Sequence, residues 1–383
     1  MKNQGRHIAT ATILTIIATV VVYFAVEAMF PIMTIASAEG AATAPMFTAH
    51  YWVISFLFSL IVVFMLYSIV VFRQKEGEDE DGYYTHGNFA LEVGWTIAPI
   101  GIVLVFAFWG TNLLIDMTSN EKDAEAWVVN VRGFKWGWAF NYPDLADHED
   151  PEIAALATAE INALVVPKDR PVVLNLISDD IIHSFWVPEF HVKQDLLPGD
   201  VKQLRFTPIM TTEEIIESHT EARGDVSYFP QVRCAEICGT SHAYMLADVW
   251  SMSNNDATAQ KILDLSKLPS GPVERGAFYY ENLGCNQCHS LDGSLDGYSG
   301  PTWLGIIGRE EALEGGSSVI VDQAYIESSI YDPNGQIVEG YAAGVMPQNF
   351  EQQFAELTAQ YAASGIEVDI IAELIAFMET LGE

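Results

Sequence analysis

The sequence predicts a membrane-anchored protein of several domains: N-terminal transmembrane helices, a β-sandwich or barrel, and an all-α C-terminal domain. Three observations predict this arrangement. Long apolar runs occupy the chain up to about Ile115, short β-rich runs follow from Ala126 to Ser251, and helical periodicity returns near the C-terminus. The length of 383 residues is enough for two or three domains.

The changes in pattern also set the expected boundaries. We divide the chain into an N-terminal hydrophobic segment (1–46), a transmembrane helix hairpin (47–120), a β domain (121–252), a linker (253–272) and a helical domain (273–383).

Composition restricts the class of protein. Hydrophobic residues make up 50% of the chain, which is high for a soluble protein and agrees with membrane spans. The formal net charge of −33 argues against nucleic acid or anionic lipid as partners and favours a basic or neutral one. We therefore expect a protein that contacts the lipid membrane and binds no nucleic acid.

The first apolar run, residues 8–30, has two interpretations. Lys2 and Arg6 precede it and Ala36-Ser-Ala38 follows it, as in a cleaved signal peptide. However, the run exceeds the apolar core of a signal peptide, about 7–15 residues, and reaches the roughly 20 residues needed to span a bilayer. A retained transmembrane helix is therefore favoured, and cleavage of residues 1–38 stays open.

Two further apolar runs, Tyr51 to Phe72 and Trp95 to about Ile115, are also long enough to span. Basic residues mark the cytoplasmic side of membrane segments. Lys2 and Arg6 put the start of the first helix inside, and Arg73 and Lys75 put the end of the second inside. The third helix then leads outward, so everything after Asp116 is expected on the outer face.

The middle of the chain consists of short runs of β-branched and aromatic residues between turn residues, as in a small β-sandwich or barrel. The segment Pro143 to Glu160 is acidic and alanine-rich, and we expect it to be a surface excursion. Five strands are expected: Trp127–Val131, Ala163–Val166, Val172–Ile177, Gln203–Phe206 and Leu246–Trp250.

One stretch in this domain gathers metal-binding residues within a dozen positions. It runs Cys234-Ala-Glu-Ile-Cys238-Gly-Thr-Ser-His242-Ala-Tyr-Met245. Thiolate, imidazole and thioether are soft ligands that suit copper, whereas a zinc site would more often have four Cys or His ligands and no Met. The alternative is a Cys234–Cys238 disulfide beside a core methionine. A further histidine lies upstream in Asp180-Ile-Ile-His183-Ser-Phe-Trp-Val-Pro188.

The C-terminal domain carries Cys285-Asn-Gln-Cys288-His289, the attachment motif for a covalent c-type haem. The two thiols bind the haem and the histidine ligates its iron. No histidine follows His289, so the second axial ligand must come from Met346 or Met378. Met378 lies on the apolar face of the expected last helix, where methionine ordinarily fills gaps, whereas Met346 lies in a Gly/Pro loop. Met346 is therefore the expected ligand.

The copper stretch, with its spacing C-x3-C-x3-H-x2-M and the distant H-S-F-W-V-P histidine, resembles the binuclear copper (CuA) site of cytochrome c oxidase subunit II. The resemblance implies a cupredoxin-like fold for the β domain. It also implies bridging by Cys234 and Cys238, with ligation by His183, His242, Met245 and the carbonyl of Glu236. In the family, the side chain at the position of Glu236 ligates a magnesium or manganese ion at the interface with subunit I.

The resemblance implies roles for two more residues. Leu91-Glu92-Val-Gly-Trp95 is similar to the family's helix start, where the acid stands at a proton-channel entrance. A first-turn acid that favours the helix dipole is the alternative for Glu92. Trp136, in Trp136-Gly-Trp138, matches the family's tryptophan that relays electrons toward copper. The alternative is a strand face packed on a core.

Helices on both sides of the haem motif look like a class I cytochrome c, expected from Arg275 to Leu283 and from Ile366 to Leu381. Together, these resemblances imply subunit II of a proton-pumping, caa-type haem–copper oxidase in the inner (plasma) membrane of a bacterium. The expected partners are oxidase subunit I, with its haem and CuB, subunit III, and an external electron donor: a cytochrome, a copper protein or an upstream complex.

Electrons would pass from that donor through haem c and CuA to subunit I, where oxygen becomes water. Two alternatives stay open: the CuA-bearing subunit of a nitric oxide reductase and a free-standing membrane electron carrier.

Overall fold

The computed structural model describes residues 4–30, 33–74, 77, 87–295, 298–348, 350–363 and 366–382. The chain divides into two units, Met1–Glu121 and Lys122–Glu383. Lys2 and Lys75, two of the basic residues used above to predict orientation, lie outside the described residues.

The first unit holds three helices that are long and apolar enough to cross a membrane: α1 (Gln4–Met29), α2 (Ala38–Val71) and α3 (Phe89–Thr118). Ser37 caps α2, because its hydroxyl accepts a hydrogen bond from the Gly40 amide at 2.9 Å. Helix α1 packs on α2, and the rings of Tyr23 and Trp52 stack with centroids 3.9 Å apart. The three expected apolar runs are therefore helices, each longer than the run that predicted it.

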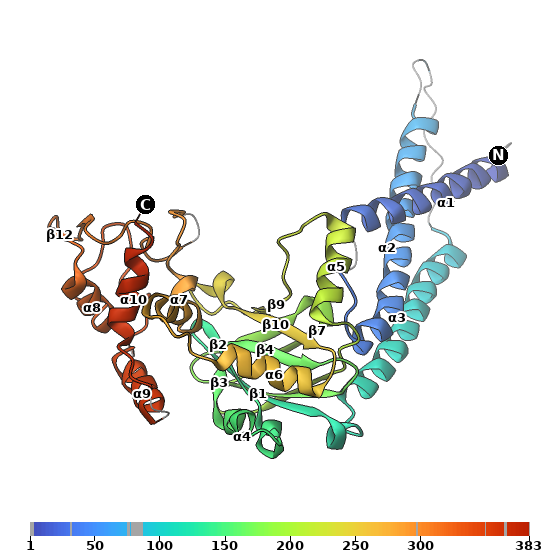
Figure 1. The fold of residues 1–383 in the computed structure, drawn as a ribbon. Coiled ribbons are helices and arrows are strands. Elements are labelled where there is room, and N and C mark those ends of the chain that lie inside the picture. Colours follow the sequence, from blue (N-terminus) through green and yellow to red (C-terminus); the bar gives the residue numbers. More distant parts are fainter. Residues whose placement is uncertain are drawn as a thin grey trace. The chain divides into compact units, whose positions relative to one another are not determined.

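The second unit begins with two five-stranded sheets packed face to face (Figure 1). One has the strand order β3-β2-β1-β5-β8 and the other β4-β10-β9-β6-β7. The strands are β1 (Trp127–Phe134), β2 (Gly137–Asn141), β3 (Glu160–Ile161), β4 (Ala163–Pro167), β5 (Val172–Ser178), β6 (His183–Val187), β7 (Val192–Leu196), β8 (Lys202–Phe206), β9 (Gln231–Cys234) and β10 (Leu246–Met252).

The core of this sandwich follows from the alternation of its strands. Along β1, the side chains of Val129 and Val131 are buried, whereas Asn130 between them is exposed. Trp138 of β2 meets Phe185 of β6 edge to face, with ring centroids 5.8 Å apart, and so joins the two sheets. All five expected strands form (β1, β4, β5, β8 and β10), and the β-sandwich prediction is confirmed.

The acidic segment 143–160 is anchored to the sandwich and is more than a surface excursion. It contains the short helices η2 (Pro143–Asp147), α4 (Pro151–Ala154) and η3 (Ala155–Thr158). Leu145 and Ile153 project from these turns into the core and are buried. A longer helix, α5 (Thr212–Arg223), begins with a capping box between Thr211 and Glu214.

Helix α6 (Asn255–Ser266) occupies most of the segment expected to be a linker. It packs on β4 and β10, as Figure 1 shows, through a buried face that includes Ile262 and Leu263. Asn254 caps its first turn by accepting a hydrogen bond from the Ala257 amide. Residues 267–271 are all that separates α6 from the next helix, α7. The remainder of the expected linker belongs to the β domain, because burial of the apolar face of α6 stabilises the helix there.

The C-terminal segment is mainly helical, with α7 (Pro272–Asn282), α8 (Gln323–Tyr331), α9 (Phe350–Ala363) and α10 (Ile370–Glu379). A small hairpin of β11 (Glu310–Ala312) and β12 (Ser318–Ile320) departs from the all-α expectation. Helices α7 and α10 cross closely at Gly276, where an added Cβ would lie 2.0 Å from the Glu373 carbonyl oxygen. Arg275 and Glu373 form an ion pair beside this crossing. The two expected terminal helices of this domain are thus present and packed together.

Candidate metal centre

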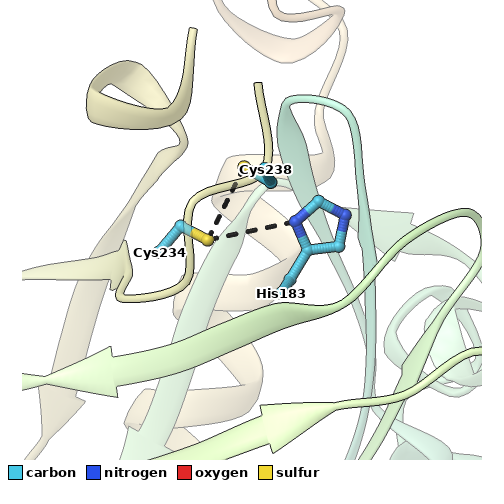
Figure 2. Close-up of side chains that lie close together, drawn as sticks. All are labelled: His183, Cys234 and Cys238. Carbon is cyan, nitrogen blue, oxygen red and sulfur yellow. Dashed lines mark hydrogen bonds between the residues drawn. The ribbon is translucent and has the colours of Figure 1, made fainter. Parts of the chain in front are cut away.

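His183, Cys234 and Cys238 come together where two adjacent strands meet the loop after β9 (Figure 2). His183 begins β6 and Cys234 ends β9, which pairs with β6 at Phe185. The Cys234 sulfur lies 3.9 Å from Nδ1 of His183 and 3.8 Å from the Cys238 sulfur. One metal-binding atom of each residue lies within 4.8 Å of the others, and all three residues are buried.

The same loop brings the remaining sequence-predicted donors to this cluster. Nδ1 of His242 lies 3.5 Å from the Cys238 sulfur, and the Met245 thioether lies 3.8 Å from that sulfur. The backbone carbonyl of Glu236 lies 3.2 Å from the Cys234 sulfur. The structure thus brings together all six expected donor groups.

Neighbouring side chains hold these donors in place. Asp180 lies 2.7 Å from Nε2 of His183, which leaves Nδ1 of that ring facing Cys234. Trp136 donates its indole N–H to the carbonyl of Cys238 at 3.2 Å, and Trp138 donates to the carbonyl of Met245 at 3.2 Å. The loop is therefore hydrogen-bonded to the β1–β2 hairpin at two points, Cys238 and Met245.

The pKa values of the two thiols are shifted in opposite directions. The contact with Cys238 lowers the pKa of the Cys234 thiol, and the contact with His183 lowers it further. The same contact, together with burial, raises the pKa of Cys238. A metal that binds both sulfurs must therefore displace the proton that this pair retains.

Asp180 is ionised beside this cluster. Burial opposes its charge, but hydrogen bonds from His183 and from the amides of Ile181 and Lys135 lower its pKa overall. An anionic carboxylate on Nε2 makes Nδ1 of His183 a stronger ligand. Two sulfurs, two imidazole nitrogens, a thioether and one carbonyl form a soft donor set that fits copper.

A second group of cofactor-binding residues lies around the Cys285–His289 motif. Nδ1 of His289 lies 2.7 Å from the Pro301 carbonyl, which fixes the ring and leaves Nε2 free to bind a metal. Burial lowers the pKa of this histidine and keeps it neutral. Gly300 packs on the ring so tightly that an added Cβ would lie 2.5 Å from His289 Cε1.

Two cavities adjoin His289, of about 820 Å³ and about 120 Å³, and Met346 lines both of them. Cys288 also lines both, and Cys285 lines the larger one. Met378 is 2% exposed and belongs to the core cluster of this domain, although it also reaches the smaller cavity. These residues could hold a haem between His289 and Met346.

Two family profiles match the chain. The one described as "Cytochrome C oxidase subunit II, periplasmic domain" matches residues 127–251, which include the copper loop and His183. The one described as "Cytochrome C oxidase subunit II, transmembrane domain" matches residues 29–113. A "Cytochrome c oxidase subunit 2" of Corynebacterium glutamicum is 30% identical over 290 residues, covering 62% of this chain and 76% of the relative.

The chain belongs to the cytochrome c oxidase subunit II family. Another member, the "Cytochrome c oxidase subunit 2" of Alkalihalophilus pseudofirmus, is 26% identical over 326 residues. The match covers 80% of this chain and 86% of the relative. The solved periplasmic domain of subunit II from Bradyrhizobium japonicum is 22% identical, with a TM-score of 0.27. The match covers 37% of this chain and 94% of the solved domain.

Membership of this family makes the chain part of the oxidase complex, with membrane-spanning N-terminal helices, a periplasmic β domain and, by implication, a CuA copper centre. Residues 252–383, which carry the Cys285–His289 motif, lie outside both profile matches.

The remaining sequence-predicted residues of this subunit II lie as follows. Glu92 is exposed in the first turn of α3, where its carboxylate accepts a hydrogen bond from the Asn88 amide at 3.2 Å, as a helix-capping acid does. The side chain of Glu236 is exposed at the edge of the copper loop. Trp136 is 8% exposed and lies against the loop through Cys238.

Sequence reasoning assigned no role to four residues that contact these sites. Three of them, Asp180, Trp138 and Pro301, make the contacts given above. The fourth is Ser241, whose hydroxyl oxygen lies 3.1 Å from the Cys288 sulfur. For Asp180 a signal exists, since a carboxylate three residues before a ligand histidine often orients it. Two other histidines of the β domain, His191 and His219, differ in burial. His219 is buried with its ring stacked on Tyr228, whereas His191 is half-buried.

Proposed function

We propose that this subunit II is the electron-input subunit of a haem–copper oxidase and carries both a CuA centre and a covalent haem c. The observation that carries the proposal is that the large cavity beside the Cys285–His289 motif is also lined by Trp136 and Cys238 of the copper site. Such an arrangement supports a caa-type subunit, in which the C-terminal domain is a fused cytochrome c.

In this proposal, the ligands of the copper pair are Cys234, Cys238, His183, His242, Met245 and the carbonyl of Glu236. Asp180 orients His183, and Trp138 fixes the carbonyl of Met245. The burial of both cysteines excludes water from the sulfurs. A bound copper pair would accept and release one electron at a time.

Cys285 and Cys288 would attach the haem covalently through thioether bonds, and His289 and Met346 would ligate its iron. Pro301 holds the tautomer of His289 that directs Nε2 toward the metal. A methionine ligand raises the reduction potential of a haem, which suits transfer at the high-potential end of a respiratory chain.

Three further roles belong to the proposal. The exposed Glu236 carboxylate would ligate magnesium or manganese at the interface with subunit I. Glu92 would stand at a proton-channel entrance and Trp136 would relay electrons, as in the family. Subunit I, subunit III and an external donor are the proposed partners. The CuA and cytochrome domains lie on the outer face of a bacterial plasma membrane in this proposal.

The test is cofactor analysis of the intact chain, purified in detergent from bacteria that make c-type cytochromes. We expect mixed-valence copper in electron paramagnetic resonance, and haem that stays on the chain after denaturation. Cys238→Ser should abolish the binuclear copper signal and keep the haem. A Cys285→Ser, Cys288→Ser double variant should lose covalent haem and keep the copper. Tetrahedral zinc without a copper spectrum, or haem removed by denaturation, would contradict the proposal.

A further inference from the structure

A cavity of about 360 Å³ lies between the first two membrane-spanning helices, where α1 begins and α2 ends. Its polar lining consists of Gln4, His7, Tyr67 and Ser68. Ala11 and Phe64, which lie further along the helices toward their middle, give it apolar walls. The cavity therefore combines a polar lining near the helix ends with an apolar one deeper in the span, as an amphiphilic ligand requires.

A hydrogen bond between the two helices forms part of this lining. Nδ1 of His7 lies 2.8 Å from the Tyr67 hydroxyl, and the His7 ring packs against Phe72 with centroids 5.1 Å apart. A neutral imidazole has one N–H and a tyrosine one O–H, and the bond between them uses one of these hydrogens. In either tautomer of His7, the other hydrogen remains available to an acceptor oxygen of a ligand.

The charges near the cavity are positive. Arg6 precedes His7 and Arg73 follows Phe72, and both arginines are exposed. The carboxylates that the structure describes on this helix pair, Glu27 and Glu39, belong to the opposite ends of the helices. Basic residues mark the cytoplasmic end of membrane helices, so the cavity lies at the level of the inner lipid headgroups. Basic pockets between membrane helices on that side bind phospholipid headgroups.

We propose that this cavity binds one phospholipid of the inner leaflet. Its phosphodiester accepts hydrogen bonds from the His7–Tyr67 pair and is attracted by Arg6 and Arg73, while an acyl chain lies against Ala11 and Phe64. The headgroup is a neutral one, phosphatidylethanolamine, because the acidic stretch 76–81 follows Arg73 in the sequence and repels additional negative charge.

The site is a property of this chain's first helix. The match to the family's transmembrane profile begins at residue 29, so α1 and its half of the lining lie outside that match. A lipid bound by both helices also ties α1 to α2.

The test is native mass spectrometry of the full-length chain in detergent, titrated with phosphatidylethanolamine. Tyr67→Phe keeps the ring beside His7 and removes the hydroxyl, so it should weaken binding of the first lipid by about two- to tenfold, the effect of one hydrogen bond. An Arg6→Gln, Arg73→Gln double variant should weaken it by at least about tenfold, because contacts with a charged group are stronger. Tyr51→Phe, near the other end of α2, is the matched control and should bind as the unaltered chain does.

Photo-crosslinking with phosphatidylethanolamine that carries a diazirine on its acyl chain locates the site. We expect labels within residues 8–11 and 64–68, competition by unlabelled phosphatidylethanolamine, weaker competition by phosphatidylglycerol, and none by millimolar inorganic phosphate. Unchanged binding in both cavity variants, labels elsewhere, or tighter binding of phosphatidylglycerol or free phosphate would overturn the proposal. An intact mass showing that the mature chain begins after His7 would overturn it as well.

Discussion

Asp180 lies 2.7 Å from Nε2 of His183 and thereby turns the opposite ring nitrogen toward Cys234. The aspartate comes from the turn before β6, whereas the cysteine ends β9. The imidazole is thus held between an anion and a thiolate, and both contacts raise its pKa against the effect of burial.

We predict that Asp180→Asn weakens copper binding by about 10- to 100-fold, because the histidine loses the carboxylate that orients it and raises its basicity. Copper titration of the purified chain against a competing chelator measures this. Asp179→Asn is the matched control, since Asp179 is in the same turn but pairs with Arg132. Equal losses in the two variants would show that the turn matters and the Asp180 contact does not.

The sulfurs of Cys234 and Cys238 are 3.8 Å apart, close enough to join after a small movement. We predict that mild oxidation of the apo chain links them and prevents copper uptake, since a disulfide offers no thiolate. Thiol labelling and copper content, measured before and after reduction, test this. Reduction should restore both values. Full copper uptake by the oxidised chain would contradict the prediction.

Met346→Leu should remove the weak near-infrared sulfur-to-iron band of the oxidised chain, because Met346 is the proposed axial ligand. Met378→Leu is the control and should keep the band. Since Met378 is buried in the core, this volume-conserving change should cost less than about 1.5 kcal/mol in the free energy of unfolding. Absorption spectra and chemical denaturation measure both effects. Loss of the band in Met378→Leu alone would reassign the ligand.

Gly300→Ala should displace His289, because the added methyl group would lie 2.5 Å from Cε1 and 2.8 Å from Nδ1 of that ring. We expect a loss of about 1–3 kcal/mol in the stability of the C-terminal domain, as for other overpacked sites. Gly382→Ala is the control, since its methyl group would meet the Glu379 carbonyl at 3.4 Å. Thermal unfolding followed at the haem absorption band would measure the difference. Equal stabilities would show that the ring can move freely.

Electron transfer from haem to CuA in the intact chain should be first order and nearly independent of ionic strength. The two domains are joined through residues 267–271, and short tethers give effective concentrations of the order of millimolar. A donor that docked from solution by charge would slow with salt, since screening acts beyond about 8 Å at physiological ionic strength. Flash reduction of the haem at low and high salt measures the rate. A tenfold fall with salt, or a rise with protein concentration, would point to a neighbouring molecule as acceptor.

The donor residues of the copper loop could be predicted from sequence because ligand type and spacing are local properties of the chain. Cys234, Cys238, His242 and Met245 lie within one loop, and their spacing alone brings them close. The contribution of Trp138 could not be predicted, because its contact with Met245 joins residues more than a hundred positions apart. The contacts of Ser241 could not be predicted for the same reason, since its partners Cys288 and Ser299 lie in the C-terminal domain.

Helix α6 shows a different limit. The segment contains polar residues at many positions, and that composition led to the linker prediction. Its buried residues, Thr258, Ala259, Ile262 and Leu263, are spaced as on one helix face, so the signal was present in the periodicity. Composition averages over a segment, whereas burial depends on which side each residue faces.

The capping of α2 by Ser37 bears on the maturation of the chain. Ala36 and Ser37 are both buried, and a protease that recognised Ala36-Ser-Ala38 would cut in the first turn of the helix. The cut would separate Ser37 from Gly40 and remove a cap worth about 1 kcal/mol. Proteolytic removal of α1 must therefore come before α2 folds. The order of folding and cleavage during membrane insertion then decides whether the mature subunit keeps α1 or begins at α2.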